Sequence, residues 1–112
     1  ERRRAIANAF LNGIKNPKIQ LPYIEQQEQH VWHLFVIQVD NRATFQSYLT
    51  EKGIQTVIHY PIPPHKQKAY SELNKLSFPL TEKIHEKILS LPISPVLIDA
   101  EVQKIINIVN GY

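Results

Sequence analysis

Residues 31–39 read VWHLFVIQV, the strongest candidate for a β-strand in this chain. Successive side chains of a strand point to opposite faces of its sheet. The two faces would therefore carry alternate members of an apolar set: Trp32, Leu34 and Val36 on one, and Phe35, Ile37 and Val39 on the other. A strand that is apolar on both faces is normally covered on both. Since a chain of 112 residues can cover one face with its own helices, the second face is expected to need another domain or subunit.

Amphipathic helices are predicted on both sides of this strand. Before it, Ile6, Phe10 and Ile14 recur at the spacing of one helix face, and Gly13 ends the pattern. After it, Asp40-Asn41 predicts a cap for a helix from about Arg42 to Lys52, which Gly53 would end in the left-handed conformation. The buried stripe of this second helix would consist of Phe45, Tyr48 and Leu49, with Arg42 on its surface.

The remaining segments alternate between extended and helical patterns. Residues 19–24 and 91–93 contain or adjoin prolines and are expected at sheet edges. Thr81 is predicted to cap a helix with the stripe Ile84, Ile88 and Leu91. Asp99 is predicted to cap the last helix, whose apolar stripe consists of Val102, Ile105, Ile106 and Val109.

This order of elements predicts the fold class α/β, in the form of an α+β sandwich. A small, mostly antiparallel or mixed sheet would be backed by helices, and residues 1–112 would form a single domain. The chain contains no methionine, and helical character begins at Glu1 without a capping residue before it. We therefore expect the chain to be part of a longer protein.

A proline-stiffened turn, YPIPPH at residues 60–65, follows a third predicted strand, Ile54 to Tyr60. Each proline fixes its own φ and pushes the residue before it towards an extended conformation. The turn carries His59, Tyr60 and His65 at the end of a strand, where binding and catalytic sites are often built. One interpretation is that the turn forms part of a binding or catalytic site. The alternative is a rigid connector whose ring side chains only fill space. Residues 65–70 could form about one helical turn.

No catalytic or metal-binding constellation is complete in the sequence. The chain has no cysteine, and its glycines are scattered at positions 13, 53 and 111, which excludes thiolate chemistry and a glycine-rich phosphate loop. His30 and His33 would point to opposite faces of a strand, without a nearby acidic pair, so no metal site is expected. Lys66 and Lys68 are expected to stay solvated rather than to form a Schiff base.

Charge and hydropathy narrow the possible partners. The net charge is +3, and the one basic cluster, Arg2-Arg3-Arg4, is interpreted as a solvated helix start, so nucleic-acid binding is not expected. No apolar run approaches the roughly 20 residues of a membrane span, and no leader peptide is recognisable. The absence of cysteine fits a cytoplasmic protein.

Several motifs, taken in order, resemble those of a known family. They are GI-T--HYP from Gly53, PH-Q-AY from Pro64, FP-TE from Phe78 and LSLPI from Leu89. Together with the first helix and the strand at 33–37, they resemble the C-terminal small domain of the DegT/DnrJ/StrS family of pyridoxal-phosphate-dependent sugar aminotransferases.

The resemblance implies a fold type I aminotransferase, usually a homodimer, whose large domain holds pyridoxal phosphate. Such an enzyme moves an amino group, typically from glutamate, to a nucleotide-linked keto sugar. The extended turn at 60–65 is similar to that of members that aminate dTDP-linked 3-keto-6-deoxy sugars for deoxyamino sugar and surface polysaccharide synthesis. The family's Schiff-base lysine and its pyridine-pairing aspartate lie in the large domain and have no counterpart here, so the chain alone is expected to be inactive.

By the same resemblance, His59, Tyr60 and His65 are candidate substrate contacts, which would bind sugar hydroxyls or phosphate oxygens. No catalytic and no cofactor-binding residue is expected in this chain. The alternative function is a free-standing α/β ligand-binding or regulatory module without catalysis. The native reading frame distinguishes the two, because the aminotransferase interpretation requires a lysine-bearing domain upstream of Glu1.

Overall fold

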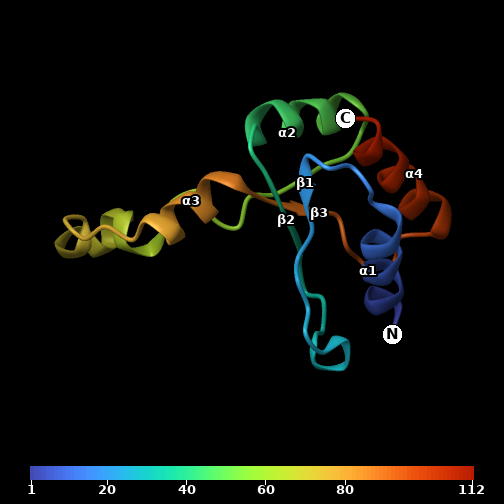
Figure 1. The fold of residues 1–112 in the computed structure, drawn as a ribbon, viewed down its shortest axis with the longest axis horizontal. Coiled ribbons are helices and arrows are strands. Elements are labelled where there is room, and N and C mark those ends of the chain that lie inside the picture. The colour runs from blue at the N-terminus through green and yellow to red at the C-terminus, as the bar shows by residue number, and fades with distance from the viewer.

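An antiparallel sheet of three short strands lies at the centre of the fold (Figure 1). This computed structural model describes residues 1–112, apart from the side chain of Gln27. Strand β2 (Phe35–Val39) is central, between β1 (Ile19–Gln20) and β3 (Ile88–Leu91), and both neighbours run antiparallel to it. The prediction of a small, mostly antiparallel sheet backed by helices is confirmed.

The central strand is shorter than predicted. It begins at Phe35 and not at residue 31, because Trp32 has a φ of +53° and the preceding η1 (Gln27–Gln29) is a 3-10 turn. Phe35, Ile37 and Val39 are buried, whereas the residues between them are half-buried. The second face of β2 is therefore only partly covered within this chain, and the expectation that another domain or subunit covers it stays a prediction.

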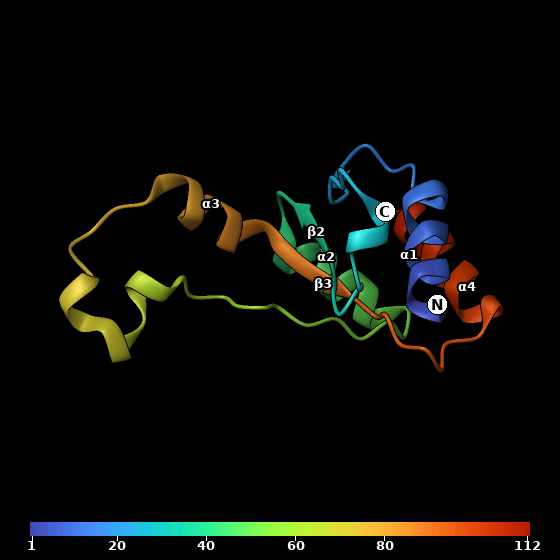
Figure 2. The same ribbon diagram turned by 90° about the horizontal axis from the view of Figure 1, so that it is seen from below.

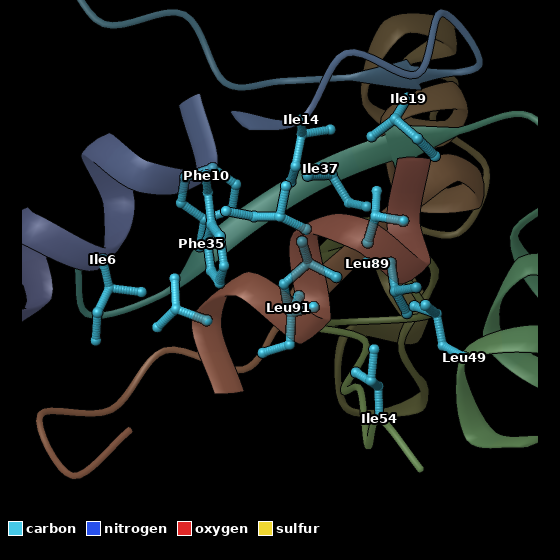
Figure 3. Close-up of a cluster of buried hydrophobic side chains, with 14 of the residues drawn as sticks. Ile6, Phe10, Ile14, Ile19, Phe35, Ile37, Leu49, Ile54, Leu89 and Leu91 are labelled. Carbon is cyan, nitrogen blue, oxygen red and sulfur yellow. The ribbon is translucent and has the colours of Figure 1, made fainter. Parts of the chain in front are cut away.

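The core lies between the sheet and three helices (Figures 1 and 3). These helices are α1 (Arg2–Gly13), α2 (Arg42–Glu51) and α4 (Asp99–Asn110). The rings of Phe10 and Phe35 meet edge to face at 5.0 Å, and Trp32 stacks on Phe35 at 5.3 Å. The predicted apolar stripe of α4 is confirmed, because each of its four residues is buried: Val102, Ile105, Ile106 and Val109.

The predicted helix starts are correct in part. Asn41 stands at the start of α2, but its side chain caps nothing there. Ile98 and not Asp99 precedes α4, and the Glu101 carboxylate accepts the Ile98 N–H at 2.9 Å. Gly53 follows α2 with a φ of +78°, the left-handed conformation that was predicted.

The basic cluster at the start of α1 binds neighbouring loops. Arg2 donates to the Leu97 carbonyl at 2.6 Å, and Arg4 donates to the Glu28 carbonyl at 2.8 Å. Arg3 contacts the loop before β2 through the His33 carbonyl at 3.4 Å. The interpretation as a solvated helix start is correct in part, since Arg4 is exposed and the other two arginines are half-buried. Their guanidinium groups also hold two loops against α1, the one at Leu97 and the one before β2.

An arm with two limbs extends away from the sheet and the three helices (Figure 2). The outgoing limb is residues 57–66 and ends in the 3-10 turn η2 (Pro64–Lys66); a second 3-10 segment, η3 (Lys68–Leu73), lies at the tip. The returning limb is α3 (Pro79–Lys87), which leads directly into β3. With the arm included, the chain measures 47 × 33 × 25 Å.

Three predictions for this region are wrong in their bounds. The predicted strand from Ile54 to Tyr60 is reduced to one bridge, in which Val57 exchanges backbone hydrogen bonds with Ser90. Helix α3 begins at Pro79, two residues before the predicted cap Thr81. It ends at Lys87 because the next four residues pair with β2, and Pro92 ends that edge strand. None of the described helices is long and apolar enough to cross a membrane.

Candidate functional site

The predicted site residues lie on the outgoing limb of the arm. His59 is half-buried, and its Nδ1 forms a hydrogen bond of 2.9 Å with the Ser90 hydroxyl. Ser90 is buried in β3, so the sheet fixes the orientation of the His59 ring. This contact engages Nδ1 and leaves Nε2 as the ring nitrogen that can reach a ligand. The peptide bond between His59 and Tyr60 is cis.

Tyr60 is the most accessible of the three candidates. Its side chain is 65% exposed, and its hydroxyl makes no hydrogen bond to any residue that the structure describes. Its backbone, in contrast, is held, because Nδ1 of His85 donates to the Tyr60 carbonyl at 2.6 Å. The ring of Tyr60 meets that of His59 edge to face at 5.7 Å. The turn therefore presents a free phenol on a fixed backbone.

His65 has a different environment. It is only 5% exposed, its Nε2 donates to Oε1 of Glu82 at 2.8 Å, and its ring packs edge to face against Phe78 at 4.9 Å. The structure thus brings His59 and Tyr60 together and separates His65 from them. A direct contact between His65 and a substrate would require the arm to open.

Glu82 joins several parts of the arm. Besides His65, its Oε1 accepts the backbone N–H of Phe78 at 3.1 Å, and the ammonium of Lys66 lies 3.8 Å away. The hydrogen bond from His65 lowers the pKa of Glu82 below its ordinary value, and the Phe78 N–H contributes in the same direction. The carboxylate is therefore favoured in its charged form.

The pKa of Glu82 predicts that acid loosens the arm. Because this pKa is lower in the folded than in the unfolded chain, the stabilisation is complete above the ordinary value of about 4.3 and is lost as the pH falls through the lowered value. The rate of hydrogen exchange of the Phe78 amide, corrected for the intrinsic effect of pH, should therefore increase as the pH falls below this ordinary value. Glu82→Gln should remove most of that dependence. An exchange rate that shows the same pH dependence in both proteins would contradict the assignment.

Sequence reasoning missed the residues that support the turn. Ser90, Glu82 and His85 were not predicted as site residues, and Arg42 was expected only to lie on a helix surface. In the structure the Arg42 guanidinium donates to the His85 carbonyl, which joins α2 to the end of α3. The one available signal was the spacing of Glu82 and His85, which places two polar side chains on the same face of a helix.

The residues of this chain do not fit a pyridoxal phosphate site on their own. A Schiff-base lysine usually lies desolvated in an apolar pocket or beside another cation that activates it. In the part of the chain that the structure describes, every lysine side chain is exposed or half-buried. Lys87, one of the less exposed, is paired with Asp40. The described side chains also include no cluster of histidine and acidic residues that could hold a metal ion.

Comparison with known proteins gives relatives over the whole chain. Residues 1–110 match the model of the DegT/DnrJ/EryC1/StrS aminotransferase family. The chain is 56% identical, over all 112 residues, to the dTDP-3-amino-3,6-dideoxy-alpha-D-galactopyranose transaminase of Aneurinibacillus thermoaerophilus, of which it covers 31%. It is 36% identical over 114 residues to the dTDP-3-amino-3,4,6-trideoxy-alpha-D-glucose transaminase of Streptomyces venezuelae; the match covers 99% of this chain and 30% of that enzyme.

Solved structures agree in fold. The crystal structure of S. venezuelae DesV in complex with a ketimine intermediate matches 98% of this chain and 30% of its own, with a TM-score of 0.91 and 35% identity. Bacillus subtilis NtdA, which holds the bound cofactor PMP, matches 98% of this chain and 27% of its own, with a TM-score of 0.86 and 31% identity. This chain therefore spans about a third of the length of its relatives, and it belongs to the DegT/DnrJ/EryC1/StrS aminotransferase family.

Proposed function

We propose that this chain is the C-terminal small domain of a pyridoxal-phosphate-dependent aminotransferase. The full-length enzyme would move an amino group from glutamate to the keto group of a nucleotide-linked sugar. The substrate class is a dTDP-linked 3-keto-6-deoxyhexose, which the named products of the two transaminases above support, and the product is a deoxyamino sugar for surface polysaccharide. The proposal includes a cytoplasmic homodimer.

Pyridoxal phosphate, when bound by the large domain, supplies the electron sink for the reaction. Because this chain has no fitting Schiff-base lysine, its own residues contribute binding and orientation, and the chain alone is inactive. Tyr60 carries the proposal: a free hydroxyl on a fixed backbone can bind a sugar hydroxyl or a phosphate oxygen. Nε2 of His59 offers a second contact beside it, while Ser90 holds the ring.

The proposed contacts predict different effects on the two half-reactions. In the full-length protein, Tyr60→Phe removes one hydrogen bond and should slow amination of the sugar nucleotide about tenfold. The rate of the glutamate half-reaction should stay within about twofold of that of the original protein, because in this proposal the phenol does not touch the amino donor. Single-turnover absorbance of the cofactor measures each half-reaction separately.

A matched control exists on the same arm. Tyr70 is 48% exposed, and its hydroxyl makes no hydrogen bond within the described part of the chain. Tyr70→Phe should therefore leave both half-reactions unchanged. Equal losses in both half-reactions for Tyr60→Phe would assign the ring a structural role. Failure of glutamate to form pyridoxamine phosphate in the full-length protein would contradict the proposed amino donor.

A further inference from the structure

The two limbs of the arm are joined by side chains rather than by backbone pairing. Beyond the bridge between Val57 and Ser90, no backbone hydrogen bond connects residues 58–66 with α3 among the described residues. In Figure 2 both limbs extend away from the sheet and meet at the tip of the arm, where η3 lies. Such a segment keeps a defined shape only where side chains bridge it, because exposed backbone without partners opens at little cost in free energy.

Two of these bridges come from one face of α3. Glu82 and His85 are three residues apart, so their side chains lie on the same side of the helix. Glu82 accepts the Nε2–H of His65 at 2.8 Å, and His85 donates to the carbonyl of Tyr60 at 2.6 Å. We call this pair, Glu82 and His85, the α3 clamp. It holds the outgoing limb at two points, one of which is the backbone of the proposed substrate contact.

The clamp is itself attached to the body of the domain. Arg42, at the start of α2, donates to the carbonyl of His85. Lys87, two residues further along α3, is paired with Asp40 in the turn before α2. Helix α3 then enters β3, which pairs with the buried strand β2. Helix α3 is therefore anchored to the core of the domain, and through its bond to the Tyr60 carbonyl it fixes the position of Tyr60.

We propose that Glu82 and His85 are positioning residues, which hold Tyr60 and His59 where a sugar nucleotide meets them. The inference rests on the proposed function, in which Tyr60 contacts the substrate. Neither clamp residue touches substrate; each acts through the outgoing limb. A contact displaced by about 1 Å loses much of its effect on rate, so loosening the limb weakens sugar binding and leaves the chemistry of the amino donor intact.

The test uses the full-length protein and two kinds of variant. Glu82→Leu and His85→Leu each remove a hydrogen bond while keeping a side chain of similar size. Each should raise the KM for the sugar nucleotide about tenfold, and the rate of the glutamate half-reaction should stay within about twofold of that of the original protein. His85→Asn keeps an N–H at the position of Nδ1 and should restore a KM near that of the original protein. Glu86→Leu is the matched control, since Glu86 is exposed on the same helix and bonds to no described side chain.

A second measurement does not depend on activity. Amide hydrogen exchange at Val57 and Lys66, whose N–H groups donate to the Ser90 and Pro63 carbonyls, should increase about tenfold in Glu82→Leu and His85→Leu, and it should stay unchanged in Glu86→Leu. Unchanged exchange in the two clamp variants would overturn the inference, as would equal losses in both half-reactions. If Tyr60→Phe is silent but the clamp variants accelerate exchange, the proposed substrate contact fails while the clamp stands.

Discussion

Replacing Phe35 with alanine is expected to lower the free energy of unfolding of this chain by about 3 to 5 kcal/mol. Phe35 has no exposed surface, and its ring lies 5.0 Å from that of Phe10, centroid to centroid (Figure 3). The ring of Trp32 stacks on it at 5.3 Å. Its side chain is fully buried and its strand pairs with β3 at Leu91, so alanine would leave a cavity inside the core. Close-packed interiors relax only partially around such a loss.

Urea denaturation followed by circular dichroism measures this change, and the fluorescence of Trp32 gives a second probe. The control is Val36→Ala in the same strand, where a half-buried side chain on the other face should cost about 1 kcal/mol. A loss that is equal for the two positions would mean that the core does not lie on the face of β2 that carries Phe35.

Replacing Asn16 with alanine is expected to cost about 2 to 3 kcal/mol of unfolding free energy. Asn16 is a buried polar residue just after α1, and its side chain satisfies two backbone groups. Its Nδ2 donates to the Val109 carbonyl at 2.8 Å, and its Oδ1 accepts the Lys18 N–H at 3.0 Å. Alanine leaves both groups without these partners in a mostly buried place, where an unmade hydrogen bond is expensive.

The neighbouring residue Asn12 provides the comparison. It is exposed in the last turn of α1, and its side chain makes no hydrogen bond to a described residue. Asn12→Ala should change stability by less than about 0.5 kcal/mol. If Asn12→Ala and Asn16→Ala were equally mild in thermal or urea unfolding, the two side-chain hydrogen bonds of Asn16 would not contribute to stability.

The helices that cover the sheet were predictable because helical periodicity is a local signal. The spacing of Ile6 and Phe10, and the stripe of α4, predicted which residues are buried, and the structure confirms them. The left-handed Gly53 was predictable for the same reason, since the end of a helix is decided by a few adjacent residues.

The strands were predicted less well. Residues 31–34 have strand-like composition but bend at Trp32, and residues 54–60 form a single bridge. Ile88, assigned to a helical stripe, lies in β3 opposite Gln38. Pairing with a distant strand decides such cases, and tertiary context overrides local propensity.

The candidate site, too, was predictable from the sequence only where local effects decide its structure. The stiff turn with His59 and Tyr60 was visible in the sequence, because proline acts on its immediate neighbours; the role of these residues as substrate contacts stays a prediction. The bond between His65 and Glu82 was not visible, and it places His65 inside the arm.

The sequence by itself determined helices α1, α2 and α4, most of their buried faces, the rigid turn and, through its motifs, the family. Only the tertiary structure decided the strand bounds, the loop contacts of the N-terminal arginines and the side chains that hold the arm. The physical reason is distance along the chain: helix periodicity and proline sterics act within a few residues. The bonds from Glu82 to His65 and from Arg42 to His85 join positions 17 and 43 residues apart, which the folded chain alone brings together.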